Sequence, residues 1–263
     1  MKVFFISTVI AYNLILLWPA YSNGWSLSLI VFLYVFELVS GLTHSLGHSW
    51  AATRYKLKPG SVNLSVPPFH QVRIRDFAGS RQSHSLLKFT LNSRHPLEKL
   101  YILAYGWGVT ALLALAGLAV LWLVPEFSLD KFYRFVTGTG LAEDIRHFGI
   151  EPALLCFVYV NCCRAVFVLI PANSFDGSKA LLALLDFGRS HYTADKIRWT
   201  IIGIVGYLTL ALSLVLGALK LFGIADVLSY YHLSVLGLVS ITILSSFSFQ
   251  FSPADDFESD YLL

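Results

Sequence analysis

Two histidines four residues apart carry the clearest chemical signal in the sequence. His44 and His48 lie in residues 36–55, at the end of an apolar run. On an α-helix this spacing places two imidazoles on one face, one turn apart, so that both can reach one metal ion. The same spacing also suits two histidines that only pack between helices. The pair therefore indicates either a metal site or a packing contact, and a third ligand would favour the metal.

An acid that could be this third ligand follows much later in the chain. Asp176 comes after Pro171, at a break between two apolar segments, and is followed by Gly177. A carboxylate in apolar surroundings is costly unless it is paired or bound to a metal. Asp is also a favoured N-cap residue, and Asp176 could simply cap the helix expected from Gly177 onward. The residues alone leave both hypotheses open.

The composition of the 263-residue chain is that of an integral membrane protein. Hydrophobic residues make up 56% and charged residues 13%, whereas soluble domains carry about 25% charged residues. Apolar runs of about 20 residues are needed to cross a bilayer. The sequence therefore predicts an all-α protein of about six transmembrane helices, forming a single membrane domain. The six apolar runs are residues 3–20, 25–43, 99–124, 152–170, 199–222 and 227–251.

The distribution of basic residues predicts the orientation of these spans. Residues 54–99 carry nine Lys or Arg against two acids, and residues 179–198 carry four against two. Residues 125–150 carry three basic residues against four acids. Since cytoplasmic loops are enriched in Lys and Arg, the first two segments are predicted to be cytoplasmic and the third to lie outside. Both termini then face the cytoplasm, in agreement with six spans.

The long polar stretch of the chain is expected to form a small insertion at the membrane surface. Residues 59–95 contain two short alternating pieces, which predict a short cytoplasmic β-ribbon with a flexible tip at residues 79–83. This stretch is too short for a separate globular domain. Its basic residues could lie on anionic lipid, and no pattern for nucleic-acid binding accompanies them. Residues 253–263 form an acidic C-terminal tail.

A further acid lies on the face of the histidine pair. Glu37 precedes His44 by seven residues, so the two side chains share one face of a helix. An ionisable residue inside a membrane is a functional candidate by default. Glu37 could line a polar path below a metal, or it could be a partnered acid without a chemical role.

Two motifs in the chain resemble those of the site-2 protease family of intramembrane zinc metalloproteases. Residues 44–48 (HSLGH) are similar to its H-E-x-G-H motif, and residues 168–177 (VLIPANSFDG) to its N-x-x-P-x-x-x-L-D-G motif. The likeness covers about residues 25–185 and is to the short form without a PDZ domain. It implies a zinc ion held by His44, His48 and Asp176, with the metal-site core in about residues 25–187. It also implies hydrolysis of transmembrane segments of membrane proteins that enter from the lipid bilayer.

The chain differs from the family motifs at three positions, and one of them is the position of the catalytic residue. Ser45 stands where the family has its catalytic Glu, Val168 replaces an Asn, and Trp107 stands where Pro is common. A serine hydroxyl does not accept a proton at neutral pH, and loss of a general base typically costs about 100- to 10,000-fold in rate. Glu37 is a weak candidate for a substitute base. The resemblance therefore predicts an endopeptidase impaired by loss of this base.

Two other functions compete with the impaired peptidase. One is a non-catalytic family member that binds or regulates client transmembrane helices, which the missing Glu favours. The other is a di-iron membrane desaturase or hydroxylase, which also uses HxxxH. That class needs further histidine boxes such as HxxHH, and none of the eight histidines supplies one.

Overall fold

The computed structural model describes most of the chain. The described residues are 2–22, 24–55, 58–63, 71–75, 95–125, 127–137, 149–172, 175–224 and 230–247. Residues 64–70 and 76–94 of the predicted insertion, including its tip at 79–83, lie outside them, as does the predicted acidic tail at 253–263.

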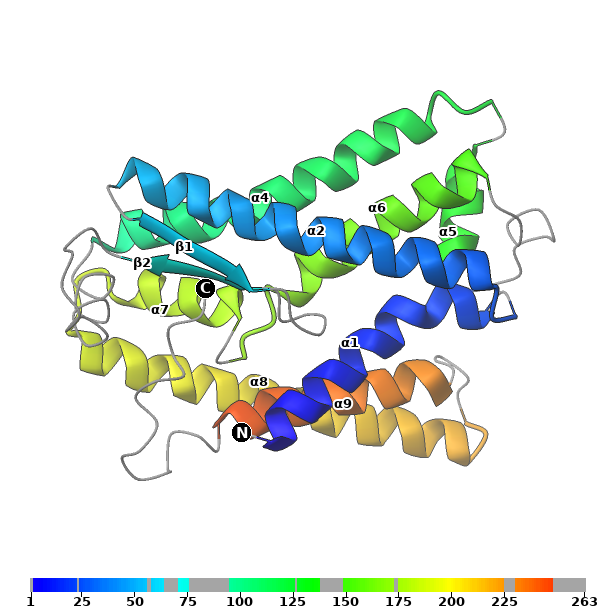
Figure 1. Cartoon of the computed structure of the whole chain (residues 1–263). Helices are drawn as coiled ribbons and strands as arrows, with labels where there is room; N and C mark the ends of the chain where they lie inside the picture. Colours follow the sequence, from blue (N-terminus) through cyan, green and yellow to red (C-terminus); the bar gives the residue numbers. More distant parts are fainter. Residues whose placement is uncertain are drawn as a thin grey trace. The chain divides into compact units, whose positions relative to one another are not determined.

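The described part of the chain is helical apart from one small sheet (Figure 1). Strands β1 (Lys58–Asn63) and β2 (Gln71–Arg75) pair in this two-stranded sheet, within the stretch where two short extended pieces were predicted. The all-α class is therefore confirmed for the body of the protein. The helices are α1 (Lys2–Ser22), α2 (Leu27–Arg54), α4 (Pro96–Leu121), α5 (Leu129–Thr137), α6 (Ile150–Phe167), α7 (Asp176–Leu185), α8 (His191–Leu221) and α9 (Tyr230–Phe247).

Five of the described helices, α1, α2, α4, α6 and α8, are long and apolar enough to cross a membrane. They correspond to the first five predicted spans and indicate a membrane protein. The sixth apolar run, residues 227–251, is described only in part: α9 covers Tyr230–Phe247, and residues 227–229 and 248–251 lie outside the described residues. Its apolar portion, Tyr231–Ser246, falls short of the length of the other five. Where six spans were predicted, the described residues therefore contain five candidate spans and one shorter apolar helix.

The helices form two compact units whose members are far apart in sequence. The first unit contains α7, α8 and α9, together with the N-terminal parts of α1 and α4. The second unit contains α2, α5, α6 and β1, together with the remaining parts of α1 and α4. His44 and His48 belong to the second unit, and Asp176 belongs to the first.

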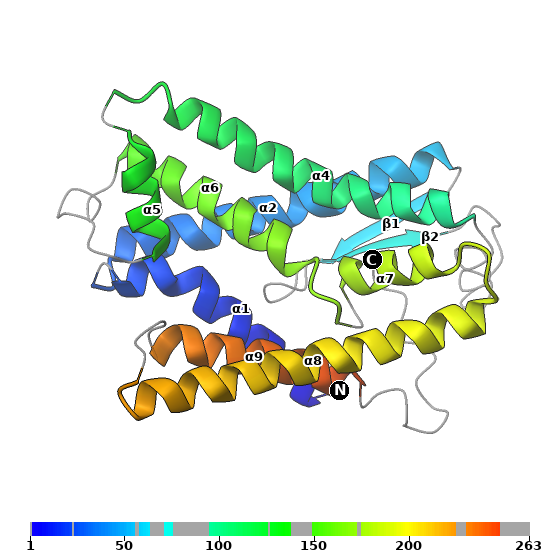
Figure 2. The same cartoon turned by 180° about the vertical axis from the view of Figure 1, so that it is seen from behind.

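In the second unit, α2 lies along α6 (Figures 1 and 2). The short turn between α1 and α2 makes these two helices neighbours, and the Tyr34 hydroxyl of α2 donates to Asn13 Oδ1 of α1 at 2.8 Å. The rings of Trp18 and Trp25 each lie 5.6 Å from that of Tyr21, measured between centroids. Such aromatic clusters are typical of helix ends at a membrane interface. This packing holds α2, the helix that carries the histidine pair.

In the first unit, α8 runs beside α9, and α7 packs on α8 (Figures 1 and 2). A buried cluster of Trp199, Ile202 and Ile243 joins α8 to α9. The Lys99 ammonium donates to Asp186 Oδ2 at 3.0 Å, which ties the start of α4 to the end of α7. These contacts fix the helix that begins at Asp176.

Candidate metal centre

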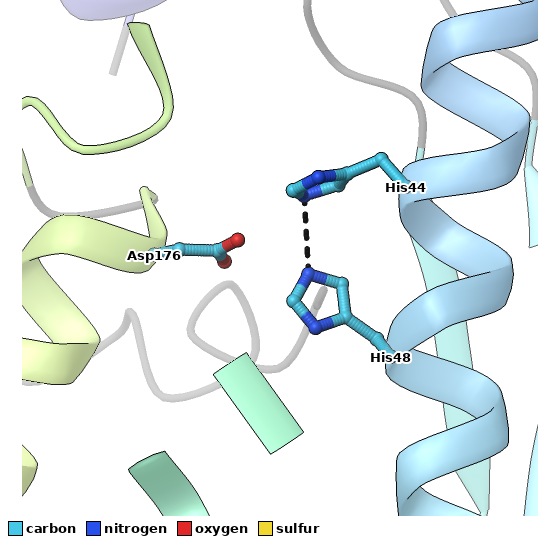
Figure 3. Close-up of side chains that lie close together, drawn as sticks. All are labelled: His44, His48 and Asp176. Atoms are coloured by element: carbon cyan, nitrogen blue, oxygen red, sulfur yellow. Dashed lines mark hydrogen bonds between the residues drawn. The ribbon is translucent and has the colours of Figure 1, made fainter. Parts of the chain in front are cut away.

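The two histidines of α2 face each other. His44 Nε2 and His48 Nε2 lie 3.1 Å apart, and the two rings are perpendicular, with centroids 4.7 Å apart (Figure 3). Both side chains are buried, with exposed fractions of 6% and 2%. The prediction that both imidazoles share one face of a helix is confirmed. Two ring nitrogens that converge on one point are the arrangement expected of metal ligands.

The second nitrogen of His44 contacts the neighbouring helix α4. His44 Nδ1 lies 3.1 Å from the hydroxyl oxygen of Thr110. That hydroxyl also lies 3.2 Å from the backbone oxygen of Gly106, one turn earlier on α4, and donates to it. Thr110 is fully buried. His44 is therefore held at both ring nitrogens.

Glycines allow α2 and α4 to approach closely at the histidines. A Cβ atom on Gly47 would lie 2.8 Å from the carbonyl oxygen of Tyr105, closer than real contacts allow. A Cβ atom on Gly106 would lie 2.3 Å from His48 Nε2. The ring of His48 thus rests directly on the backbone of α4, and Gly106 allows this tight packing.

Glu37 is a partnered acid. It is fully buried and forms an ion pair with Arg164 of α6, whose exposed fraction is 1%. One turn further along α2, Ser40 donates to Asn161 Oδ1 of α6 at 2.9 Å. The ion pair shows that Glu37 has a charged partner, and it engages the carboxylate that a substitute general base would have to use.

Asp176 is the first residue of α7, and the N-cap position is occupied by Phe175. The alternative in which Asp176 caps a helix from Gly177 onward is therefore wrong by one position. The following glycine is required, because a Cβ atom there would lie 2.1 Å from the carbonyl oxygen of Leu169. Its backbone N–H donates to Val168 O at 2.9 Å. This turn places a buried carboxylate, 8% exposed, at the start of α7 (Figure 3).

Two of the positions that differ from the site-2 protease motifs, Ser45 and Trp107, take part in hydrogen bonds within and between helices. Ser45 follows the first histidine on α2 and is 2% exposed. Its carbonyl oxygen accepts from the Ser49 hydroxyl at 3.1 Å. Trp107 donates from its indole nitrogen to the carbonyl oxygen of Ala165 at 3.1 Å, which ties α4 to α6. A serine at position 45 offers a hydroxyl and no carboxylate beside the histidine pair.

Three residues around the histidine face of α2 were not predicted from the sequence. Arg164 had a visible signal, because it is a cation inside an apolar run and Glu37 is an acid inside another. Thr110 and Asn161 had none, because a single polar residue in an apolar helix usually bonds to its own backbone.

Comparison of the chain with protein-family models, curated proteins and solved structures finds no match.

Proposed function

We propose that His44, His48 and Asp176 bind one zinc ion, and that the chain is an intramembrane endopeptidase similar to the site-2 proteases. The observation that carries this proposal is the pair of buried imidazoles whose Nε2 atoms lie 3.1 Å apart on one face of α2. Each of the three side chains is buried.

The chemistry of the three donors suits zinc. Zinc is bound by imidazole nitrogen and carboxylate oxygen, and three protein ligands leave one position open, as in catalytic sites. Zinc at such a site supplies a Lewis acid that polarises a carbonyl group and makes water nucleophilic near neutral pH. His44 and His48 would hold it from α2, and Asp176 from the start of α7.

The burial of the two histidines determines the class of substrate, and the residue at position 45 determines how fast it can be hydrolysed. His44 and His48 are buried on a candidate membrane span. The scissile bond must therefore belong to a transmembrane segment that has entered from the bilayer and unwound locally. The Ser45 hydroxyl cannot take the proton from an attacking water, so the hydrolytic step should be slow.

A second candidate function is favoured by Ser45 itself. A chain that lacks the proton acceptor but keeps three buried metal ligands could bind and regulate transmembrane helices without cleaving them. Both functions take the same class of partner, a membrane-protein helix. A cleavage assay separates them, because only the peptidase yields a product that disappears when His44 is replaced.

The metal content of the purified chain tests the site. The detergent-purified protein should hold one zinc ion per chain, and His44→Ala should lose it, because one imidazole and one carboxylate are too few ligands to retain zinc. Elemental analysis provides the measurement. His191→Ala is the matched control, since this histidine is about half exposed and bonds to Asp186. A parent chain that holds no zinc and whose thermal stability ignores chelators would show that this is not a metal site.

The orientation of the chain is part of the proposal and is tested separately. The excess of basic residues at 54–99 and 179–198 places both termini in the cytoplasm. In a variant whose three native cysteines are replaced, an impermeant thiol reagent added from outside should label Gly138→Cys and miss Gly79→Cys. Both positions lie outside the described residues. The reverse labelling pattern would overturn the orientation.

A further inference from the structure

We infer that Gly106 and Thr110, one turn apart on α4, position the two histidines for metal binding. Gly106 makes room for the ring of His48, and Thr110 fixes which nitrogen of His44 carries the proton. The inference rests on the metal site proposed above, although the contacts that support it lie entirely within the second unit.

The direction of the hydrogen bonds at Thr110 defines the tautomer of His44. A threonine hydroxyl has one proton and can accept with its lone pairs. Thr110 donates to Gly106 O at 3.2 Å, in the bond that helical threonines commonly make to the preceding turn. It must then accept from His44 Nδ1 at 3.1 Å, so the proton of the neutral ring is on Nδ1. The lone pair is left on Nε2, the atom that faces His48 Nε2.

This arrangement is the one that a metal ligand needs. A metal-bound histidine almost always donates its other ring N–H to an oxygen acceptor, which holds the ring orientation and makes the ligating nitrogen more basic. Thr110 is fully buried. Removing its hydroxyl would leave the Nδ1–H of His44 without this acceptor in a site with little access to water, which is costly.

Gly106 meets a steric requirement that its neighbour Gly108 does not. A Cβ atom on Gly106 would lie 2.3 Å from both Cε1 and Nε2 of His48, and 2.7 Å from Cδ2. His48 is 2% exposed and has little room to retreat. A Cβ atom on Gly108 would meet nothing within 4 Å. The need for glycine is therefore specific to the turn beneath the histidine.

Replacing Thr110 tests the hydrogen bond. Thr110→Val, which keeps the shape of the side chain, should lower zinc affinity about 10- to 100-fold, the usual effect of losing such a supporting bond. Thr110→Ser keeps the hydroxyl and should stay close to the parent. Thr209→Val is the matched control, because the Thr209 hydroxyl donates to the carbonyl oxygens of Val205 and Gly206 on another helix. Affinity is measured on the full-length detergent-purified chain by competition with a chromophoric chelator at fixed pH.

Nitrogen NMR of the imidazoles gives a readout that does not depend on zinc. In the metal-free parent, the ring of His44 should show its proton on Nδ1, and Thr110→Ser should preserve this signature. In Thr110→Val the nitrogen signals of His44 should change, because Nδ1–H has lost this acceptor. Thr110→Ala, which removes the hydroxyl without adding a branched side chain, serves in its place if the valine variant does not fold by circular dichroism.

Replacing Gly106 tests the steric requirement. Gly106→Ala should bind zinc at least about tenfold more weakly than the parent, because His48 must move from its position as a ligand. Gly108→Ala should bind zinc like the parent. Two results would overturn the inference. One is an equal zinc affinity of Gly106→Ala and Gly108→Ala. The other is a Thr110→Val chain with the parental zinc affinity and the parental tautomer of His44. A parent chain that binds no zinc refutes the proposed metal site instead, and the NMR readout on the metal-free chain then decides the role of Thr110.

Discussion

Ser45→Glu is expected to raise the rate of cleavage of a model transmembrane substrate by about two to four orders of magnitude over the parent chain. Position 45 lies on the turn of α2 that carries both histidines, and no residue from 44 to 48 carries a carboxylate. A Glu at this position would supply the proton acceptor for the attacking water and could pass the proton to the leaving amine. The metal ligands would be unchanged, so the effect should appear in turnover and leave zinc content as it is.

The controls for this experiment separate charge from size. Because Ser45 is 2% exposed, any larger side chain must be accommodated among buried neighbours. Ser45→Gln adds the same volume without a proton acceptor and should stay at the parental rate. Adding His44→Ala to Ser45→Glu should abolish the gain, which mass spectrometry of the products would show.

Two results would contradict the proposed peptidase with an impaired base. A Ser45→Glu chain that binds zinc and substrate yet remains inert would favour a dedicated helix-binding protein. A parent chain that cleaves at an ordinary enzymatic rate, with activity lost in Glu37→Gln, would show that the base has moved to Glu37. The ion pair of Glu37 with Arg164 argues against the second result.

Helical periodicity was enough to predict the part of the site that lies on one helix. Residues four apart share a face whatever packs against them, so His44 and His48 could be placed together from the sequence. Apolar length likewise predicted five of the candidate spans. It failed at helix ends: α6 stops at Phe167, short of the predicted end at residue 170, in a turn where Val168 O accepts from Gly177 N. Gly177 lies beyond the apolar run, so nothing within residues 152–170 indicates this hydrogen bond.

What the sequence could not predict depends on which helices are neighbours. The sequence did not reveal the partner of Glu37, because Arg164 lies on α6, more than a hundred residues later. The contact of Gly106 with His48 likewise follows only from the approach of α4 to α2. Contacts between helices that are distant in sequence are set by packing, which a single sequence does not reveal.

Arg164→Met is expected to lower the free energy of unfolding by about 3–5 kcal/mol. The substitution keeps much of the apolar volume of the side chain and removes the cation. It leaves Glu37, which is fully buried, without the guanidinium that balances its charge. A buried charge that loses its partner is strongly destabilising, because the pair has already lost its contact with water. Unfolding of the detergent-solubilised chain in SDS, followed by circular dichroism, provides the measurement.

A double-mutant cycle distinguishes the unpaired charge from lost packing. Glu37→Leu combined with Arg164→Met replaces both charges by apolar groups and should recover most of the lost stability. Arg134→Met is the matched control, since its pair with Asp130 is about half exposed and should contribute only about 0–1 kcal/mol. If the double variant is no more stable than Arg164→Met alone, the shape of the arginine and not its charge holds α2 against α6. Parental stability of Arg164→Met would show instead that the ion pair does not hold the helix carrying His44 and His48.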